Sequence, residues 1–483
     1  MRQRLVTPEN KQWWTLAAVS VGLFMIMLDN TVVNVALPSI RRSLGLSFSE
    51  LQWVVAGYAL TFAAFMLIGG KLADLLGRRL IFMTGLVVFT GASLACGLAS
   101  NGTMLNTARV VQGLGGALMN PATLSIITAT FPARQRGTAI GIWAGVSAMA
   151  LAIGPLVGGL LTEHVNWNWI FFINVPIGIA GLLLAPLLID ESKDTSADQR
   201  LDLPGLVTSA LGLFSLTFAF IEANRYGWTS AVILGAFATA AVSLAVFLVL
   251  ELRQRAPMLD LSLFRSRTFS GANTSMLFVG LAMFGTFFYV SLYMQNVLGY
   301  SPVQAGASFL PMTLLIILLA PRAGKLSDRV GSRWLVGGGM TLLSIMLLYY
   351  SRLGADASFW AILPGLIIGG IGMGATMTPV TAAAMSSVPV DKAGVGSAVL
   401  NSMRQVGGSL GIAVMGAIVA SGTTTALESG STPQLAFLHG FHDALRVAAL
   451  LAFIGAIVAV ATIRKNVHAH HPVAEPAPAI ESA

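Results

Sequence analysis

The sequence predicts an all-α protein that crosses a membrane many times. Three observations favour this class: 55% of the 483 residues are hydrophobic, only 10% are charged, and the mean hydropathy is +0.78. A soluble protein of this length would need far more charged surface. The net charge of +8 does not indicate nucleic-acid binding, because the basic residues are spread over short segments between apolar runs, a pattern typical of membrane orientation.

Fourteen apolar windows have about the length that spans a bilayer. In chain order they are 13–38, 51–73, 80–99, 103–128, 138–161, 167–188, 204–222, 230–250, 270–297, 303–323, 335–352, 358–387, 394–421 and 443–463. The basic head before the first window resembles a signal peptide, but that window is too long and lacks a small-residue cleavage site. We therefore expect it to remain as the first span.

Lysine and arginine are biased to one side of these spans. With the N-terminus inside, the inner segments hold Lys71, Arg78, Arg79, Arg134, Arg136, Arg253, Arg255, Arg265, Arg267, Lys325, Arg329, Arg333, Arg464 and Lys465. The outer loops hold only Arg41, Arg42, Arg225 and Arg352. This bias predicts a multi-pass protein of the cell (inner, cytoplasmic) membrane with both termini in the cytoplasm.

An internal repeat divides the chain. GKLADLLGRR at 70–79 returns as GKLSDRVGSR at 324–333, and MNPAT at 119–123 returns as MTPVT at 377–381. The echoes predict two homologous six-span halves, 1–190 and 269–464. Between them, 191–268 is expected to hold a charged linker, with a short surface helix, and two inserted spans. The tail 465–483 contains HAHH and Pro-Ala repeats and is expected to be disordered and cytoplasmic.

Asp29 is an acid inside the first span, in LDNTVVNVALP. Such a charge costs about 2.5–3.5 kcal/mol on insertion scales and by default marks an ion or substrate pathway. Asn30, Thr31 and Asn34 lie beside it and suggest a polar interior stripe. The alternative is an acid near the outer end of its helix, reached by water.

Arg109 is the basic counterpart, in LNTARVVQGLGGA at 105–117 of the fourth span. A guanidinium cannot shed its charge, so it needs a partner or a wet cavity, unless it extends to the outer interface. Burial would disfavour the charged form of Asp29, and a nearby Arg109 would favour it. Gln112, one turn further, is assigned to the substrate cavity.

Other polar residues of the spans have less certain roles. Asn401, Arg404 and Gln405 form a cluster in span 13, interpreted as cavity lining, as a charge balancing Asp29, or as a structural interhelical hydrogen bond. We expect Glu222, at the outer end of span 7, to be a solvated loop acid rather than a proton site.

Enzyme chemistry has no support in the sequence. GGSLG at 407–411 fits a nucleophile-elbow pattern, but it lies in a spanning helix with no buried histidine as base. No H-E-x-x-H motif and no phosphate-binding G-x-x-x-x-G-K-[ST] loop occurs, so we expect no catalytic residue, no cofactor and no functional metal site. The single Cys96 is expected to pack in the apolar interior.

The repeated loop resembles the signature of the major facilitator superfamily, whose members rock two six-helix halves. In that family the loop latches conformational states. The resemblance assigns this role to Gly70, Asp74, Gly77, Arg78 and Arg79, and to Gly324, Asp328, Gly331 and Arg333. The residue types also have physical roles in such a loop: the glycines permit a tight turn, Asp74 can face a helix N-terminus, and the arginines anchor at the membrane interface.

Three further segments narrow the resemblance to the fourteen-spanner drug:proton antiporters. LDNTVVNVALP, WNWIFFINVPIG at 167–178 and the two extra central spans are similar to that family, with Asn168 standing where a basic residue is usual. GIWAGVSAMALAIGPLVGGLL at 141–161 is similar to the antiporter motif and carries Gly141, Gly154, Pro155, Gly158 and Gly159, with Ala150 in place of a glycine. The glycines let a neighbouring helix approach closely. The R-x-x-Q-G element at Arg109 is implied to help proton transfer.

The resulting expectation is proton-driven export by alternating access, with Asp29 and Arg109 coupling the proton to lipophilic, cationic or neutral drugs. The expected partners are these small molecules and the lipid bilayer, with no nucleic acid, and the expected working unit is a monomer. Two alternatives stay open. One is an exporter of a lipid, siderophore or amino acid on the same scaffold, and the other is a membrane sensor or lipid-binding protein that does not transport.

Overall fold

The computed structural model describes residues 10–193, 201–254, 257–389 and 392–464, and all of its long elements are helices. The predicted tail 465–483 and most of the linker predicted between 190 and 202 lie outside these residues.

The first seven helices are α2 (Lys11–Leu44), α3 (Phe48–Leu76), α4 (Arg78–Gly97), α5 (Gly102–Thr130), α6 (Ala133–His164), α7 (Trp169–Phe172) and α8 (Asn174–Leu188). Two more follow, α9 (Leu203–Tyr226) and α10 (Ala231–Arg253). A short 3-10 helix, η1 (Leu261–Arg265), leads to the last group: α11 (Arg267–Asn296), α12 (Pro302–Ser308), α13 (Leu310–Val330), α14 (Ser332–Tyr350), α15 (Phe359–Met385), α16 (Ala393–Glu428) and α17 (Pro433–Thr462).

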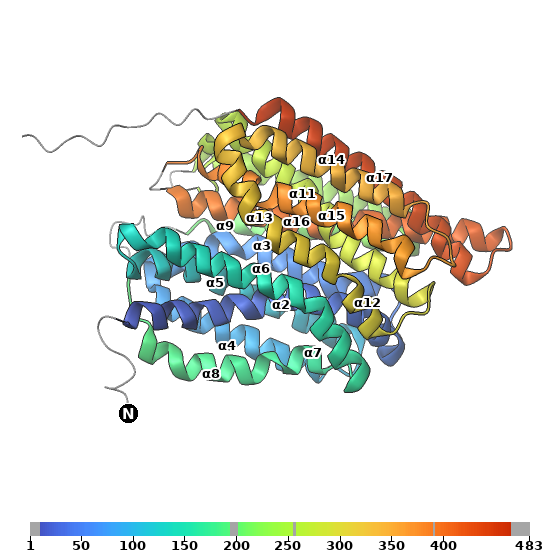
Figure 1. Ribbon diagram of the computed structural model, residues 1–483, viewed down its shortest axis with the longest axis horizontal. Coiled ribbons are helices and arrows are strands. Elements are labelled where there is room, and N and C mark those ends of the chain that lie inside the picture. The colour runs from blue at the N-terminus through green and yellow to red at the C-terminus, as the bar shows by residue number, and fades with distance from the viewer. Residues whose placement is uncertain (1–9, 194–200, 255–256, 390–391, 465–483) are drawn as a thin grey trace, which may run out of the picture.

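Within the described residues, thirteen helices are long and apolar enough to cross a membrane. They coincide with thirteen of the fourteen predicted windows. The fourteenth, 335–352, corresponds to α14, which is 19 residues long and rich in glycine near its start, and which packs between α15 and α17. The helices run side by side along the long axis of the molecule (Figure 1). We call the end where the described chain begins at Asn10 and ends at Arg464 the terminal face, and the opposite end the distal face.

Several helices extend beyond their apolar windows. The prediction ends the first span at Pro38, but α2 continues to Leu44 and stops at Gly45, whose φ of 64° is left-handed. A proline disturbs the turn before it and not the turn after it, so the helix can continue past Pro38. The last span begins ten residues before the predicted 443, at Pro433, because proline is favoured in the first turn of a helix.

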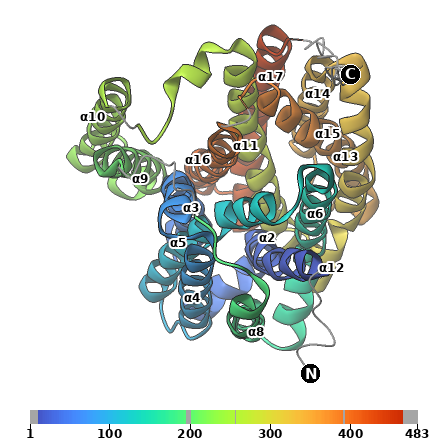
Figure 2. The same cartoon turned by 90° about the vertical axis from the view of Figure 1, so that its left-hand side faces the viewer.

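The two inserted helices stand to one side of the bundle (Figure 2). α10 packs on α9, and α9 lies against both α3 and α16. Near its end α10 also contacts the segment that follows it, where Glu251 accepts from the Leu259 N–H at 2.9 Å. At the terminal face Asp202 caps α9 by accepting from the Gly205 N–H at 2.7 Å and also accepts from the Met258 N–H at 3.3 Å. Beyond it, Lys392 donates to Asp260 at 2.6 Å and lowers the pKa of that carboxyl. The insert is therefore joined at one end to the segment that leads into α11.

Contacts between the first and last groups of helices gather toward the distal face. Ser291 and Gln295 of α11 donate to the carbonyls of Asn34 and Val35 of α2, at 3.1 and 2.8 Å. Glu163 of α6 accepts from the backbone of Val303 at the start of α12. These bonds close the distal side of the interface between the two groups.

Candidate functional site

The candidate site centres on a buried ion pair between α2 and α5. The Arg109 guanidinium donates through Nη1 to Oδ2 of Asp29 at 2.5 Å, and the two side chains are 1% and 0% exposed. Gln112 donates to the other carboxylate oxygen of Asp29 at 3.0 Å. Asp29 therefore faces the protein interior, not lipid, and its alternative as a water-reached acid at a helix end is wrong.

The rest of the arginine is held equally firmly. Its Nε donates to the carbonyl of Val54 on α3 at 2.9 Å, and Nη1 also donates to Oε1 of Gln112 at 2.7 Å. The guanidinium lies 4.3 Å from the ring centre of Tyr58 and 5.6 Å from that of Phe171. Burying a charge pair is tolerated only when its remaining donors and acceptors are satisfied, and here α3 and α7 supply what the pair itself does not.

A second layer of polar groups fixes the amide of Gln112. Ser93 of α4 lies 3.3 Å from Gln112 Nε2, donates to the Phe171 carbonyl at 2.9 Å, and accepts from Asn174 of α8 at 3.0 Å. Cys96, buried as predicted, lies 3.6 Å from Gln112 Oε1. Six helices, α2, α3, α4, α5, α7 and α8, thus converge on one charge-neutral cluster.

The asparagines beside Asp29 bond to their own helix. Asn30 donates to the Ile26 carbonyl at 2.8 Å, and Asn34 donates to the Asn30 carbonyl at 3.1 Å. Their side-chain oxygens are buried and have no partner among the described residues. Buried acceptors without a donor are costly, so these two oxygens can accept a hydrogen bond from water or a ligand.

The structure does not bring the C-terminal cluster to Asp29. Asn401 donates to the Ser397 carbonyl at 3.0 Å and Gln405 is buried. Arg404 is partly buried, and no carboxylate of the described residues pairs with it. The charge that balances Asp29 is therefore Arg109, and not Arg404.

Glu222 corrects the expectation of a solvated loop acid. It is only 5% exposed because α9 packs along the seam between α3 and α16, and its Oε1 accepts from the Trp53 indole at 3.3 Å. Two residues on, Asn224 donates to the Ala417 carbonyl of α16 at 2.8 Å. The sequence placed Glu222 in a loop because the helix was expected to end there, whereas α9 continues to Tyr226.

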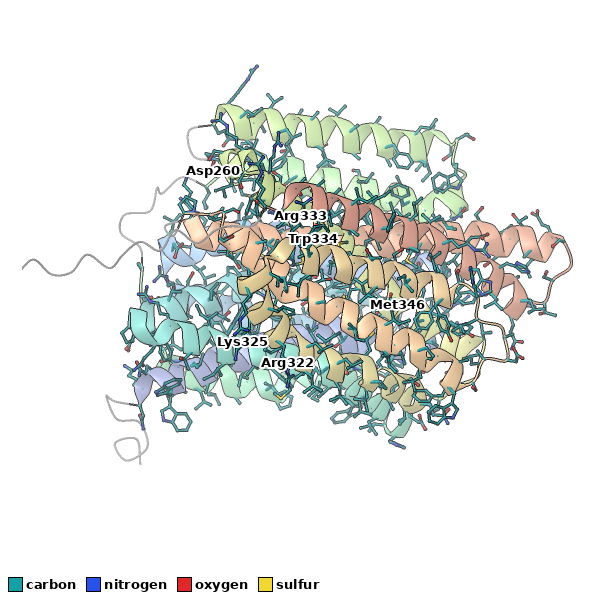
Figure 3. The ribbon with its side chains drawn as sticks, turned by 45° about the horizontal axis from the view of Figure 1, so that its top comes forward. Asp260, Arg322, Lys325, Arg333, Trp334 and Met346 are labelled. Atoms are coloured by element: carbon teal, nitrogen blue, oxygen red, sulfur yellow. The ribbon has the colours of Figure 1, made fainter. Side chains whose placement is uncertain are left out.

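The two repeated loops have the same backbone form. Gly77 between α3 and α4 has a φ of 129°, and Gly331 between α13 and α14 has a φ of 89°, values that side chains disfavour. Arg78 pairs with Asp74 at 3.0 Å. Arg333 lies over the ring of Trp334 at 5.1 Å (Figure 3), while the side chain of Asp328 lies outside the described part. Gly70 and Gly324 complete the pattern; a Cβ at Gly70 would touch Pro121 and one at Gly324 would meet Thr378.

Asp74, which was expected to face a helix N-terminus, accepts hydrogen bonds from the Arg78 side chain and from no backbone N–H of the described residues. Its carboxylate is engaged by Arg78, and the acid at the start of α4 is Glu191. Glu191 accepts from the backbone N–H groups of Arg79 and Leu80, both at 3.1 Å. The sequence missed this role because Glu191 lies more than a hundred residues away in a segment predicted to be a linker.

The glycines of α6 permit two close helix approaches. A Cβ at Gly154 or Gly158 would collide with α2, and a Cβ at Gly159 would lie 2.5 Å from the carbonyl of Pro302 on α12. On the same turn, Pro155 presents its carbonyl to Gly306 of α12. The predicted close approach is therefore present.

Two other positions of α6 behave differently from these glycines. A Cβ at Gly141 would meet nothing within 4 Å, so the first part of α6 is not held by a neighbour there. Ala150, which departs from the motif, is fully buried in the apolar core around α2 and α5, so helix contact is not loosened at this point. Asn168, the other departure, donates to the Gly97 carbonyl at 2.6 Å and joins α7 to the end of α4.

Comparison with known proteins gives one family. The family model described as "Major Facilitator Superfamily" matches residues 19–412. The chain is 38% identical over 420 residues to the multidrug resistance protein Stp of Mycobacterium tuberculosis, covering 86% of this chain and 78% of that protein. It is 37% identical over 411 residues to the tetracenomycin C resistance and export protein of Streptomyces glaucescens, covering 85% and 76%. It is 35% identical over 464 residues to the puromycin resistance protein pur8 of Streptomyces alboniger, covering 94% and 91%.

Solved structures give the same fold. A bacterial homologue of the lysosomal transporter Spinster, in an inward-facing and unoccupied conformation, aligns with a TM-score of 0.67 at 19% identity, over 95% of this chain and 98% of that one. An auto-inhibited POT family peptide transporter aligns with a TM-score of 0.69 at 15% identity, over 96% and 99%. The expected helical membrane fold is confirmed.

Proposed function

This chain belongs to the major facilitator superfamily, and we propose that it exports lipophilic drugs and other toxic compounds in exchange for protons. The observation that carries the proposal is the buried pair of Asp29 and Arg109. A carboxylate that is fully buried and held by a guanidinium can exchange its proton only when the surrounding helices move. Relatives with resistance and export in their names support a drug as cargo.

We propose that the moving units are residues 1–190 and 269–464. The bonds from α11 to the Asn34 and Val35 carbonyls, and from α12 to Glu163, hold the distal side shut. Toward the terminal face, α6 exposes Ile142 and Met149 and has open space beside Gly141. If both termini lie on the cytoplasmic side of the cell membrane, the terminal face is also cytoplasmic, and this conformation would be open to cargo from the cytoplasm.

The coupling cycle follows from the charge balance. With the distal side open, protonation of Asp29 releases Arg109 and rearranges α2 against α5, which weakens the cargo site. With the terminal side open, loss of the proton restores the ion pair and the cargo site together. Reciprocal linkage requires that proton and cargo lower each other's affinity by the same factor.

The repeated loops fit a role as latches between the two conformations. At the first loop, Glu191 joins the end of the N-terminal unit to the start of α4, and Arg79 also donates to the Ile189 carbonyl. Both loops lie at the terminal face, where the units separate. We expect them to act on the rate of interconversion rather than on cargo affinity.

The test is proton release by purified protein on adding cargo. We expect Asp29→Asn to abolish drug-driven proton release, because the asparagine cannot carry the proton. Glu428→Gln is the matched control: it removes an exposed acid at the end of α16 and should release protons like the unmodified protein. Undiminished release by Asp29→Asn would place coupling at another residue.

Efflux in cells tests the cargo class. Expression should lower the accumulation of a fluorescent lipophilic dye, and a protonophore should remove the effect. Accumulation that does not change with expression would refute the export of drugs and leave the other cargo classes of the same scaffold.

A further inference from the structure

Arg404 is a charge in the membrane interior without a counter-charge. It lies at mid-height of the bundle, because the neighbouring Ser402 hydroxyl bonds to the Ala63 carbonyl in the middle of α3, and its own carbonyl faces Gly280 in the middle of α11. Its Nε is buried without a partner, and no carboxylate among the described residues lies within 4.0 Å of its guanidinium. The rest of the side chain is only partly buried.

The sequence has few acids in the helices of the last group, which include α16 and most of its neighbours. Between residues 267 and 462 the sequence has five acids: Asp328, Asp356, Asp391, Glu428 and Asp443. Of these, Asp443 pairs with Arg446 and Glu428 is the last residue of α16. None of the described carboxylates is paired with Arg404.

The acid of the N-terminal half is already engaged. Both oxygens of Asp29 accept hydrogen bonds, from Arg109 and from Gln112, and the cluster is neutral. Arg404 therefore leaves an uncompensated positive charge at mid-height of the bundle, because the other buried acids, Glu222, Asp202 and Glu251, lie at the ends of α9 and α10. A guanidinium stays charged at every relevant pH, so this excess cannot be removed by losing a proton.

Two further basic residues on α13 add to the positive charge of this half of the molecule. Arg322 and Lys325 lie on the stretch of α13 nearer the terminal face, on the side that is exposed (Figure 3). The nearest acid on that helix, Asp328, is at its end. These two exposed cations add positive charge to the half of α13 that lies toward the terminal face.

We propose that Arg404 binds an anionic group of the cargo, such as a carboxylate or an ionised phenol, so that lipophilic organic anions are among the exported compounds. This deepens the proposed function and rests on it. The guanidinium presents two parallel N–H groups that match a carboxylate, and an anion would satisfy the charge that the protein leaves open. Neutral and cationic cargo would bind elsewhere in the interior and would not need Arg404.

The binding test uses two dyes with the same xanthene core and opposite charge. Fluorescein is an anion at pH 7.4 and rhodamine 123 is a cation. Fluorescence polarisation measures the binding of each dye to purified protein in detergent. We expect Arg404→Gln to weaken fluorescein binding at least tenfold, because a hydrogen-bonded charge pair is lost. The affinity of Arg404→Lys for fluorescein should lie between those of the unmodified protein and Arg404→Gln, since lysine keeps the charge and loses the paired donors.

Two controls separate charge recognition from misfolding. Arg352→Gln makes the same change of charge at an exposed position on the distal face and should leave fluorescein binding unchanged. Rhodamine 123 binding should be the same or tighter in Arg404→Gln, because removing a positive charge cannot repel a cation. Equal loss of both dyes in Arg404→Gln and Arg404→Lys, or no fluorescein binding to the unmodified protein, would overturn the proposal.

Efflux of the two dyes from cells distinguishes this inference from the proposed function. Fluorescein efflux that depends on Arg404, beside rhodamine efflux that does not, supports both. Rhodamine efflux without any fluorescein binding overturns the inference and leaves the function standing. Fluorescein binding that depends on Arg404, in cells that export neither dye, supports the site and contradicts drug export.

Discussion

The buried pair of Asp29 and Arg109 makes a sharp prediction about stability. Removing Arg109 leaves a carboxylate with no solvent exposure and only the Gln112 amide as donor. Removing Asp29 leaves a guanidinium that keeps the Val54 carbonyl and the face of Tyr58 but loses its counter-charge. Breaking one side of a buried pair costs about 3–5 kcal/mol, whereas replacing both sides is often nearly neutral.

A double-mutant cycle measures this coupling. We expect Asp29→Asn and Arg109→Gln each to lower the free energy of unfolding by about 3–5 kcal/mol. The double variant should lose no more than either single variant, so that the coupling energy is at least about 3–5 kcal/mol. The assay is reversible unfolding of the purified proteins in mixed micelles, followed by tryptophan fluorescence.

The control cycle is a pair on the terminal face. Asp74 near the end of α3 and Arg78 at the start of α4 are partly exposed, and exposed pairs couple by about 0.2–1 kcal/mol. Cycles on Asp74→Asn and Arg78→Gln should therefore be nearly additive. Losses that add to within about 0.5 kcal/mol at Asp29 and Arg109 as well would refute the reasoning, because the pair would then be no more coupled than distant sites.

Three further predictions concern packing, capping and closure. Gly158→Val should abolish folding or transport, because its Cβ would meet the backbone of α2, whereas Gly141→Ala, with open space around it, should be tolerated; expression level and dye efflux measure both. Glu191→Gln should lower stability by about 1 kcal/mol, since a neutral amide caps the start of α4 less well than a carboxylate, and a thermal melt unchanged from the unmodified protein would contradict the cap. Gln52→Ala removes bonds from α3 to α11 and α16 on the distal side and should widen the distal distance between spin labels, as seen by pulsed electron resonance; an unchanged distance distribution would show that other contacts hold the closure.

The spans and the ion pair illustrate what the sequence could predict. Long apolar windows allow little besides a spanning helix, so their positions were predicted to within a few residues at most ends. Asp29 and Arg109 were singled out because a charge in such a window is rare and costly. Their contact, 80 positions apart in the chain, was expected only if the two helices pack, and the structure packs them.

The partners that complete the site carry no comparable signal. The Val54 carbonyl is a backbone atom, and Ser93 and Asn174 are polar residues of types that occur in many membrane helices. Glu191 and Glu222 were misjudged for a related reason. An acid near a predicted helix end is ordinarily solvated, and only the packing of α9 and the course of the chain after α8 bury or engage these two.

The position of α9 makes the two flanks of the protein unequal. On one flank α9 packs on both α3 and α16 and covers the seam between them (Figure 2). On the opposite flank no inserted helix of the described residues covers the seam between α6 and α13. A compound dissolved in the lipid would therefore meet α9 on the first flank and the uncovered contact between α6 and α13 on the second. Lateral entry of cargo from the bilayer would therefore take place between α6 and α13.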